Sequence, residues 1–386
     1  KNDGTVWSWG YNNYGQLGDN TQISKYTPVQ VLAENGDGYL QDIIYISAGE
    51  NYSIAVNKQG EVWSWGQNNY GQLGDGSKTS KYTPVKAKAN LAGVISVSCG
   101  KRHVVALKSD GSVYTWGDNT YGQLGDNTKV SKLIPVKVLA DENSYINDAI
   151  SISATNYSTN ILKSNGTIVS VGLGTSGQLG DNTKVSKQIP VQVLNENGDG
   201  PLNNITTIKS GSNTTYALSK SGEVYSWGYN GYGQLGTNDK INKTEPTQLF
   251  ETIKNEKGED VQEKVENVID VAAGNYHTLI LKKDGTVWTT GLNNYGQLGN
   301  GTNTNSSSLS KVKLNDQGDY LENVVAVSAG GLTSYALTTD GEVYSWGYNS
   351  YGQFGIDNTS ASNYPVKMQK VYNIIQISAG EDFLLM

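Results

Sequence analysis

Short apolar runs separated by turn residues recur along the whole chain, and none of them keeps a sustained helical period. In one stretch, Ser53–Asn57 and Glu61–Gly66 flank a Lys-Gln-Gly turn, which is typical of a β-hairpin. In the second run alternate side chains face opposite ways, with Val62 on one face and Trp63 and Trp65 on the other. The pattern therefore predicts strands rather than helices.

Two more strands complete the unit around this hairpin. The apolar run Ile43–Ser47 comes before the hairpin, and Pro84–Ala87 comes after it. Proline has no backbone N–H to donate, so it fits a strand at the outer edge of a sheet. We expect four antiparallel strands in each unit, which is the composition of a propeller blade.

The unit recurs seven times, and a Gly-Gln pair marks each copy. The seven glycines are separated by 56, 51, 55, 56, 63 and 56 residues. They are Gly15, Gly71, Gly122, Gly177, Gly233, Gly296 and Gly352. A regular period of this order identifies a repeat architecture. We therefore predict an all-β fold, a seven-bladed β-propeller of four-stranded antiparallel blades, in a single domain over residues 1–386.

The two chain ends supply parts of one blade. The closing segment Ser378–Met386 repeats the motif that begins at Ser47, so Met386 takes the repeat position of Ala55. Lys1 takes the position of Asn57, two residues further on. A blade shared between the N- and C-termini closes the ring and removes exposed sheet edges. The predicted repeats are residues 47–97, 98–152, 153–208, 209–271, 272–327 and 328–377, with 378–386 plus 1–46 as the closing blade.

The order of motifs within each unit resembles the regulator of chromosome condensation repeat. That order is Ser-Ala-Gly, then Gly-x-Val-Trp-x-Trp-Gly, then Asn-x-Tyr-Gly-Gln-Leu-Gly, then Pro, and it covers essentially the whole chain. All seven units keep Gly-Gln, six keep Gly-Gln-Leu-Gly, and five keep Trp-Gly before it. The resemblance implies a seven-bladed propeller, whereas function depends on sites that differ among proteins of one fold.

Composition narrows the choice of partners. The net charge is −7, and Arg102 is the single arginine among 29 basic residues. Nucleic-acid binders usually carry a basic stripe, so we expect no nucleic-acid partner. We find no apolar segment of about 18 residues, so we expect no membrane span. The lone cysteine, Cys99, excludes an internal disulfide and is expected to be a small buried strand residue.

Two motifs imitate cofactor and metal sites. The sequence GLGTSG from Gly172 matches Gly-x-Gly-x-x-Gly, but it continues into the same loop as every other repeat, whereas a dinucleotide site needs a helix there. The acidic segments Glu34–Gly38, Glu196–Gly200 and Asn315–Asp319 offer fewer oxygens than calcium requires and fit hairpin turns. We therefore predict no cofactor and no metal.

The two histidines, His103 and His277, occupy one repeat position in different units. The same position elsewhere holds Tyr52, Ser158, Thr214, Thr333 and Phe383. A position that accepts phenylalanine is typical of strand packing rather than catalysis. The Gly-x-Ser-x-Gly, His-Glu-x-x-His and paired-cysteine motifs are also absent. We predict that the protein is not an enzyme.

Tyrosines dominate the aromatic residues, with 25 Tyr against 3 Phe, and they cluster around Gly-Gln. We expect the glycine to supply a positive backbone φ, the glutamine to bond unpaired backbone groups, and the leucine to anchor the loop in the core. Tyrosine precedes Gly-Gln in six units, with Ser176 as the exception. This uniformity also fits a structural role in which each ring stacks on the neighbouring blade, so both interpretations stay open.

The position three residues before this tyrosine varies, which predicts an exposed loop tip. Its occupants are Tyr11, Gln67, Asp118, Leu173, Tyr229, Leu292 and Tyr348. Sevenfold geometry would gather these tips around one mouth of the ring, and tyrosine is favoured at protein-binding hot spots. The predicted protein-binding residues are Tyr11, Tyr14, Tyr70, Tyr121, Tyr229, Tyr232, Tyr295, Tyr348 and Tyr351.

The favoured function is a non-catalytic platform that binds another protein through the loops at one mouth, in an inhibitory or adhesive role. The resemblance implies two precedents: a eukaryotic branch that exchanges guanine nucleotide on a small GTPase and binds chromatin, and a bacterial branch with a secreted β-lactamase inhibitor. The acidity, the single arginine and the near-identical repeats favour the bacterial branch, and with it an extracellular or cell-surface location.

Two alternatives remain. In the exchange hypothesis, the longest repeat inserts a hairpin within Thr247–Asp270 that acts as a wedge against a GTPase, although a longer surface loop is the simpler interpretation. In the second alternative, the tyrosine-rich mouth stacks on the sugars of a glycan.

Overall fold

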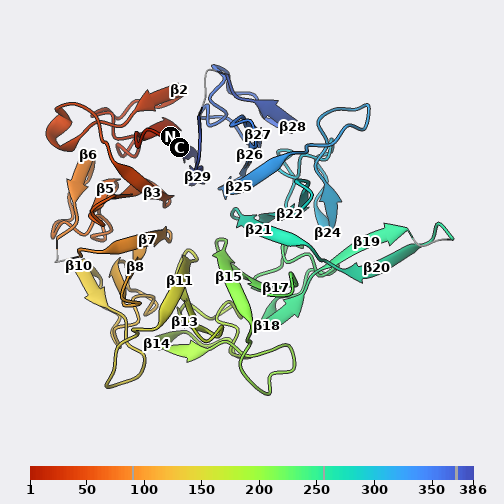
Figure 1. Cartoon of the computed structure of the whole chain (residues 1–386), viewed down its shortest axis with the longest axis horizontal. Helices are drawn as coiled ribbons and strands as arrows, with labels where there is room; N and C mark the ends of the chain where they lie inside the picture. The colour runs from red at the N-terminus through yellow and green to blue at the C-terminus, as the bar shows by residue number, and fades with distance from the viewer. Residues whose placement is uncertain (89–90, 255–256, 370–372) are drawn as a thin grey trace.

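Seven four-stranded antiparallel sheets stand around a central axis in the computed structural model (Figure 1). The structure describes residues 1–88, 91–254, 257–369 and 373–386. Each sheet is a blade with its first strand at the channel and its last strand at the rim. The predicted all-β, seven-bladed propeller is therefore confirmed.

Six blades follow one another along the chain, each running from its innermost to its outermost strand. Blade 1 comprises β3 (Ile43–Ala48), β4 (Tyr52–Asn57), β5 (Val62–Gly66) and β6 (Lys81–Lys86). Blade 2 comprises β7 (Val94–Cys99), β8 (His103–Lys108), β9 (Val113–Gly117) and β10 (Lys132–Lys137). Blade 3 comprises β11 (Ala149–Ala154), β12 (Ser158–Lys163), β13 (Ile168–Gly172) and β14 (Lys187–Gln192).

The same order holds in the second half of the chain. Blade 4 comprises β15 (Ile205–Ser210), β16 (Thr214–Ser219), β17 (Val224–Gly228) and β18 (Lys243–Gln248). Blade 5 comprises β21 (Val268–Ala273), β22 (His277–Lys282), β23 (Val287–Gly291) and β24 (Ser306–Lys311). Blade 6 comprises β25 (Val324–Gly330), β26 (Thr333–Thr338), β27 (Val343–Gly347) and β28 (Ser362–Lys367).

Blade 7 is built from both ends of the chain, as predicted. Its inner strands are β29 (Ser378–Ala379) and β30 (Phe383–Leu385), and its outer strands are β1 (Trp7–Gly10) and β2 (Lys25–Gln30). In the register, Ser8 pairs with Leu385 and Gly10 with Phe383. The backbones of Trp7 and Met386 exchange two hydrogen bonds of 3.0 Å, which continue this ladder to the last residue.

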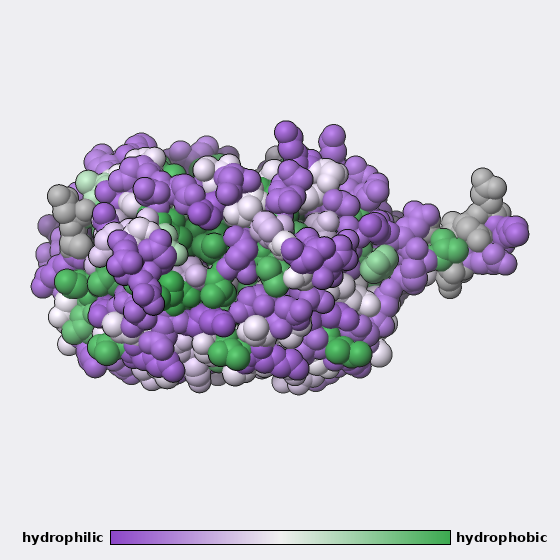
Figure 2. Space-filling model, turned by 90° about the horizontal axis from the view of Figure 1, so that it is seen from below, coloured by the Kyte–Doolittle hydropathy of each residue, from purple (hydrophilic) through white to green (hydrophobic). Residues whose placement is uncertain are grey.

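Three further elements lie outside the blades. A hairpin of β19 (Phe250–Lys254) and β20 (Asp260–Lys264) forms a separate two-stranded sheet, and η1 (Glu34–Gly36) is one turn of 3-10 helix. The hairpin runs outward from the rim in Figure 1 and stands clear of the body in the side view of Figure 2. The insertion in the longest repeat is therefore a hairpin and not an irregular loop. Among the described residues, no helix is long and apolar enough to span a membrane.

Two details of the sequence prediction differ from the structure. The outer strand expected at Pro84–Ala87 is β6, which begins three residues earlier at Lys81 and has the proline in its interior. The predicted repeat starts at residues 47, 98, 153, 209, 272 and 328 all lie inside innermost strands. The reason is that the Ser-Ala-Gly motif used as the repeat anchor marks the end of the innermost strand rather than the start of the blade.

The hydrophobic core lies between blades rather than within them. Val62 joins an apolar cluster with Val94, Val104 and other residues of blade 2, whereas Trp63 and Trp65 of the same strand join a cluster with blade 7. The alternation predicted for β5 therefore gives each blade two apolar faces, one for each neighbour. In the described part of the chain, seven such clusters fill the seven interfaces.

A hydrogen bond to the glutamine of Gly-Gln joins each blade to the next. The indole N–H of Trp65 in blade 1 donates to the backbone oxygen of Gln16 in blade 7 at 2.8 Å, with both groups buried. Four other tryptophans do the same at 2.9 to 3.1 Å: Trp9 to Gln353, Trp116 to Gln72, Trp227 to Gln178 and Trp346 to Gln297. In the other two interfaces, a threonine hydroxyl donates instead: Thr159 to Gln123 and Thr278 to Gln234.

The glycine of Ser-Ala-Gly is required by the side chain three residues later. A Cβ on Gly49 would lie 2.0 Å from Cε1 of Tyr52, because that ring folds back beneath the loop. Blade 3 has Thr155 at the glycine position, and there the later residue is the small Ser158, which bonds the threonine hydroxyl at 2.6 Å. Each glycine thus matches the residue that follows it three positions on.

We expect Trp65→Phe to lower the free energy of unfolding by about 2–4 kcal/mol, because it removes a buried hydrogen bond and leaves a cavity between blades 1 and 7. Trp63→Phe, in the same strand and on the same face but only partly buried, is the matched control and should cost about 1 kcal/mol or less. Guanidinium denaturation measures both. Equal costs for the two variants would contradict the role given to the buried indole.

Candidate protein-binding face

Two kinds of loop meet at one face of the ring. Inner loops join the first strand of a blade to the second, as at residues 49–51, and outer loops join the third strand to the fourth, as at residues 67–80. Because successive strands are antiparallel, both kinds lie at the same end of each blade. All nine predicted contact tyrosines belong to outer loops, so we call this end of the ring the tyrosine face.

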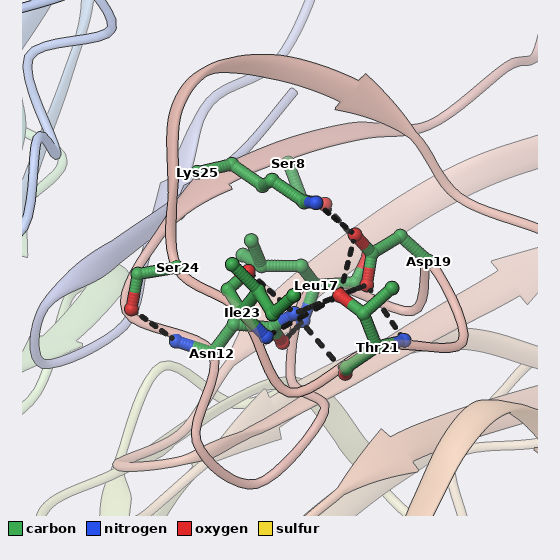
Figure 3. Close-up of polar contacts among 8 residues, drawn as sticks. All are labelled: Ser8, Asn12, Leu17, Asp19, Thr21, Ile23, Ser24 and Lys25. Carbon is green, nitrogen blue, oxygen red and sulfur yellow. Dashed lines mark hydrogen bonds and ion pairs between the residues drawn. The ribbon is translucent and has the colours of Figure 1, made fainter.

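A buried asparagine organises each outer loop. The Asn12 side chain donates to the Asp19 carboxylate at 3.0 Å and to the backbone oxygens of Thr21 and Ile23 at 3.2 Å, while its own oxygen accepts the N–H of Leu17 at 3.0 Å (Figure 3). The same position is held by the buried Asn68, Asn119, Asn230, Asn293 and Asn349. Our sequence reasoning assigned this organising role to Gly-Gln-Leu, although the repeated asparagine was visible in the motif.

The roles expected for Gly, Gln and Leu are present in the loop around Gly15. Gly15 has a φ of 78°, in the left-handed region that favours glycine. The Gln16 side-chain oxygen accepts the N–H of Tyr14 at 3.0 Å, and Leu17 is fully buried. The loop is therefore held by polar and apolar contacts that do not use the tyrosine rings.

The position three residues before this tyrosine is not the exposed tip that we expected. Gln67, Asp118 and Leu292 are buried there, and Tyr11, Leu173, Tyr229 and Tyr348 are half-buried. These side chains follow directly after the glycine that ends the third strand, so they are covered by the neighbouring inner loop. The exposed residues lie two positions later: Asn13, Asn69, Thr120, Thr175, Gly231, Asn294 and Ser350.

The tyrosine rings contact one another across blade boundaries. An arc of five rings spans blades 5, 6 and 7, and we call it the tyrosine arc. Its successive ring centroids are 5.0, 6.2, 4.8 and 6.4 Å apart in the order Tyr295, Tyr348, Tyr351, Tyr11 and Tyr14. Two of its four contacts, Tyr295–Tyr348 and Tyr351–Tyr11, cross from one blade to the next. The rings therefore stack on neighbouring blades while their outer edges remain accessible, with Tyr295 42% exposed.

The remaining predicted tyrosines make similar contacts elsewhere on the face. Tyr229 and Tyr232 pack with Tyr276 of blade 5, whose centroid is 5.0 Å from that of Tyr232. Tyr121 packs on Tyr157 of blade 3 at 5.2 Å. Tyr276 and Tyr157 lie on inner loops and were missed by the sequence reasoning, because only the packing of two loops from different blades brings them beside the predicted rings.

The single arginine of the chain lies on this face, between two blades. The Arg102 guanidinium of blade 2 is 3.2 Å from the Glu50 carboxylate of blade 1 and donates to the Tyr70 hydroxyl at 3.0 Å. Its central carbon lies 4.9 Å from the centroid of the Tyr70 ring. Lys101 also pairs with Glu50, at 2.9 Å. A carboxylate and a tyrosine ring of one blade thus hold a cation of the next.

Two acidic residues occupy the inner loop of blade 7. Glu381 accepts a hydrogen bond from the Asn275 amide at 2.9 Å, and the backbone oxygen of Asp382 accepts the N–H of Tyr11 at 3.0 Å. Burial, reinforced by the neighbouring Glu381 carboxylate, raises the pKa of Asp382 to about 7. Negative charge is therefore concentrated next to the tyrosine arc.

A central channel opens on the same face. The seven innermost strands and inner loops line a cavity of about 480 Å³, which includes the ion pair of Lys209 and Asp270 at 2.9 Å. At the mouth, backbone N–H groups of Lys101, Asn156 and Asn275 each donate to the inner loop of the following blade. These bonds tie the inner loops of blades 2, 3 and 4 in sequence, and those of blades 5 and 6 to each other. Cys99 is only partly buried and lines this cavity, so it is not the fully buried residue that we expected.

The histidines pack in the strands, and they do not form a catalytic group with other residues. His103 and His277 are both buried, and their Nε2 atoms bond the hydroxyls of Thr159 at 3.1 Å and Ser334 at 2.9 Å. Burial lowers the pKa of His103 to about 4 and that of His277 to about 3. Among the described residues, no group of three or more His, Cys, Asp or Glu side chains is placed to hold a metal ion.

The fold and the repeated motif are shared with known proteins. Residues 1–265 match the family model described as RCC1-like domain. Residues 268–297 with 324–353, and 284–337 with 340–386, match two models of the Regulator of chromosome condensation (RCC1) repeat. These matches cover nearly the whole chain, and the chain belongs to the family of RCC1-repeat propellers.

Individual relatives agree with this assignment. The chain is 30% identical over 363 residues to the ultraviolet-B receptor UVR8 of Arabidopsis thaliana, covering 93% of this chain and 76% of the relative. It is 27% identical over 407 residues to the regulator of chromosome condensation of Homo sapiens, covering 98% of this chain and 89% of the relative. Both relatives are eukaryotic, so they give no support to the expected bacterial-like, secreted character.

Solved structures share the fold. Human WBSCR16 has a TM-score of 0.80 at 21% identity, with 99% of this chain and 98% of that chain covered. Yeast RCC1 (Prp20), in its complex with Kap60, has a TM-score of 0.79 at 22% identity, with 99% of this chain and 88% of that chain covered.

We expect His277→Thr, which copies the residue of blades 4 and 6, to reduce the pH dependence of stability. The folded pKa of about 3 lies below the ordinary value of 6.5, so the unfolded chain binds the proton more readily in this window. Wild-type stability should therefore fall relative to the variant as pH decreases below 6.5, by about 1.4 kcal/mol per pH unit.

The measurement is the difference in unfolding free energy between wild type and variant at several pH values from 7 to 4.5. Asp382 acts in the opposite direction in this window, because its folded pKa of about 7 lies above the ordinary 3.8. Its contribution and that of His103 are common to both proteins and cancel in the difference. A difference that does not change with pH would show that His277 is accessible to protons in the folded state.

Proposed function

We propose that this propeller is a rigid, non-catalytic platform that binds another protein through the tyrosine face. The observation that carries the proposal is the tyrosine arc, in which five rings from three blades lie in mutual contact with accessible edges. Tyrosine adds large contact area at a small cost in conformational entropy, which is why it is common in protein interfaces. An inhibitory or an adhesive role would both use such a surface.

The construction of the outer loops supports this division of labour. The buried asparagine, the glycine and the leucine hold the loop, so the tyrosines are not needed to form it. Ser176 takes the tyrosine position in blade 3, and its N–H still donates to the Gln178 side chain at 2.8 Å. The ring is therefore dispensable for the loop, and contact with a partner is a reason to keep it.

Relatives with this fold act on other proteins according to their titles. Yeast RCC1 (Prp20) was solved bound to Kap60, and Prp20p is described together with its binding to Gsp1p and histones. These partners belong to those proteins. They support a protein, rather than a glycan, as the class of partner that we propose for this chain.

We expect the double variant Tyr295→Ser and Tyr351→Ser, which copies Ser176, to keep its unfolding midpoint and to bind its protein partner at least about 10-fold more weakly, close to 1.4 kcal/mol. Tyr39→Ser with Tyr145→Ser is the matched control, because both tyrosines are exposed at 51% and 54% and lie at the opposite end of the blades. The measurement is calorimetric affinity for the partner captured by the wild-type chain. Equal affinities of the two double variants would move the binding site off the tyrosine face.

Nucleotide exchange on a GTPase is the second candidate, because the β19–β20 hairpin projects from the rim as a wedge would (Figure 2). The hairpin has a narrow base, where the N–H of Val265 donates to the oxygen of Leu249 at 3.1 Å and both side chains are buried. Residues 250–264 can therefore be replaced by a short Asn-Gly turn without opening the core.

We expect this hairpin deletion to leave partner affinity within about 2-fold of wild type, since the tyrosine face is untouched. Partner affinity and the rate of nucleotide release from a GTPase partner are the two measurements, and an unchanged unfolding midpoint is the control for folding. If the deletion abolishes binding or nucleotide release, then the hairpin is the functional element and the exchange hypothesis replaces the platform.

A further inference from the structure

The tyrosine face is electrically divided into two halves. Eleven residues after the start of each outer loop, an exposed residue lies beside the loop tip; in blade 7 this residue is Gln22, which bonds the Asn13 oxygen at 3.0 Å. Blades 1 to 4 carry lysine at this position: Lys78, Lys129, Lys184 and Lys240. Blades 5 to 7 carry the neutral residues Asn303, Thr359 and Gln22. The neutral half is the half that holds the tyrosine arc.

The inner loops increase this contrast. Blade 2 contributes Lys101 and Arg102 to the mouth, and blade 7 contributes Glu381 and Asp382. Among the described residues, no ion pair within 4.0 Å joins either acid of blade 7 to a basic side chain. The tyrosine arc thus ends beside two carboxylates and away from the lysines of the face, which is the environment that a cation favours.

The protein contains its own example of a cation bound in such a place. Arg102 lies between the Glu50 carboxylate and the Tyr70 ring of the preceding blade, at 3.2 Å and 4.9 Å. By repeat position, Glu50 corresponds to Glu381 and Tyr70 to Tyr14. Blade 7 therefore repeats both the carboxylate and the ring that hold the arginine in blade 1.

The residue that should supply the cation differs. Asn51 of blade 1 stands at the repeat position of Arg102, and its side-chain oxygen accepts a hydrogen bond from the Gln16 amide at 3.3 Å. The chain therefore provides no guanidinium to Glu381 and Tyr14. Asp382 and the Tyr11 ring, 6.4 Å from the Tyr14 ring, extend the same surface toward the rest of the arc.

We propose that a basic segment of the partner binds here, with an arginine side chain against the Glu381 carboxylate and the Tyr14 ring, as Arg102 lies against Glu50 and Tyr70. The proposal rests on the proposed function and specifies the chemistry of the partner. A planar guanidinium suits this pair of groups, because it can bond a carboxylate at its edge and stack on a ring with its face.

The test uses three labelled peptides on the full chain, (Gly-Arg)₄, (Gly-Gln)₄ and (Gly-Glu)₄, with fluorescence anisotropy at a physiological ionic strength of about 0.15 M. We expect only (Gly-Arg)₄ to bind. Glu381→Gln should weaken this binding at least about 10-fold, because it removes the carboxylate. Asn51→Arg should weaken it similarly while keeping the fold, because it supplies in the chain the cation that the peptide would bring.

Each variant has a control with the same change in charge at the opposite end of the blades. Asp37→Asn matches Glu381→Gln, and Asn197→Arg matches Asn51→Arg, since Asp37 and Asn197 are both exposed. Both controls should bind (Gly-Arg)₄ within about 2-fold of wild type. Equal losses in the controls would assign binding to the net charge of −7 and overturn the proposal. Failure of (Gly-Arg)₄ to bind the wild-type chain would overturn it as well.

The outcome separates this proposal from the platform on which it rests. If the Tyr295 and Tyr351 double variant loses its protein partner but Glu381→Gln retains both that partner and (Gly-Arg)₄, then the tyrosine face binds protein without using a basic segment at Glu381. If the Tyr295 and Tyr351 variant keeps its partner, then the platform itself is wrong.

Discussion

The ring depends on one repeated contact, the hydrogen bond from a buried side chain of one blade to the glutamine carbonyl of the next. Trp9 makes it at the closure, where its indole N–H reaches Gln353 from the other end of the chain at 2.9 Å. Each bond lies beside an interblade apolar cluster, so the polar contact fixes the register of two surfaces that hydrophobic packing alone would leave free to slide. Where tryptophan is absent, threonine preserves the bond, which shows that the acceptor carbonyl matters more than the ring.

The same glutamine links the scaffold to the candidate binding surface. Its backbone oxygen serves the neighbouring blade, while its side-chain oxygen accepts the N–H of the residue before Gly-Gln, as in Gln16 with Tyr14 at 3.0 Å. The tyrosine is thus placed by its backbone, and its ring is left to contact other rings. Scaffold and surface occupy adjacent residues with separate tasks, and this separation allows one face to vary in charge and aromatic content without loss of the fold.

Variation around the ring gives this symmetric fold a direction. Seven equivalent loops present lysine in four consecutive blades and neutral residues in the other three, and the tyrosine arc follows the neutral half. Arg102 completes a site between blades 1 and 2, whereas Asn51 leaves the corresponding carboxylate and ring of blade 7 without a cation from the chain. A partner would therefore bind in one orientation, because complementary charge exists on one side of the mouth only.

The sequence by itself determined the strands, the number of blades and the shared closing blade, because these follow from local alternation and from motifs that recur at a regular period. The partners of the tyrosines depended on tertiary structure, since Tyr351 and Tyr11 meet at 4.8 Å from opposite ends of the chain. Burial of the position of Gln67 and Leu292 also depended on it, because the cover comes from the loop of a neighbouring blade. A repeat fixes what each unit is, and only packing between units decides which side chains touch and which remain exposed.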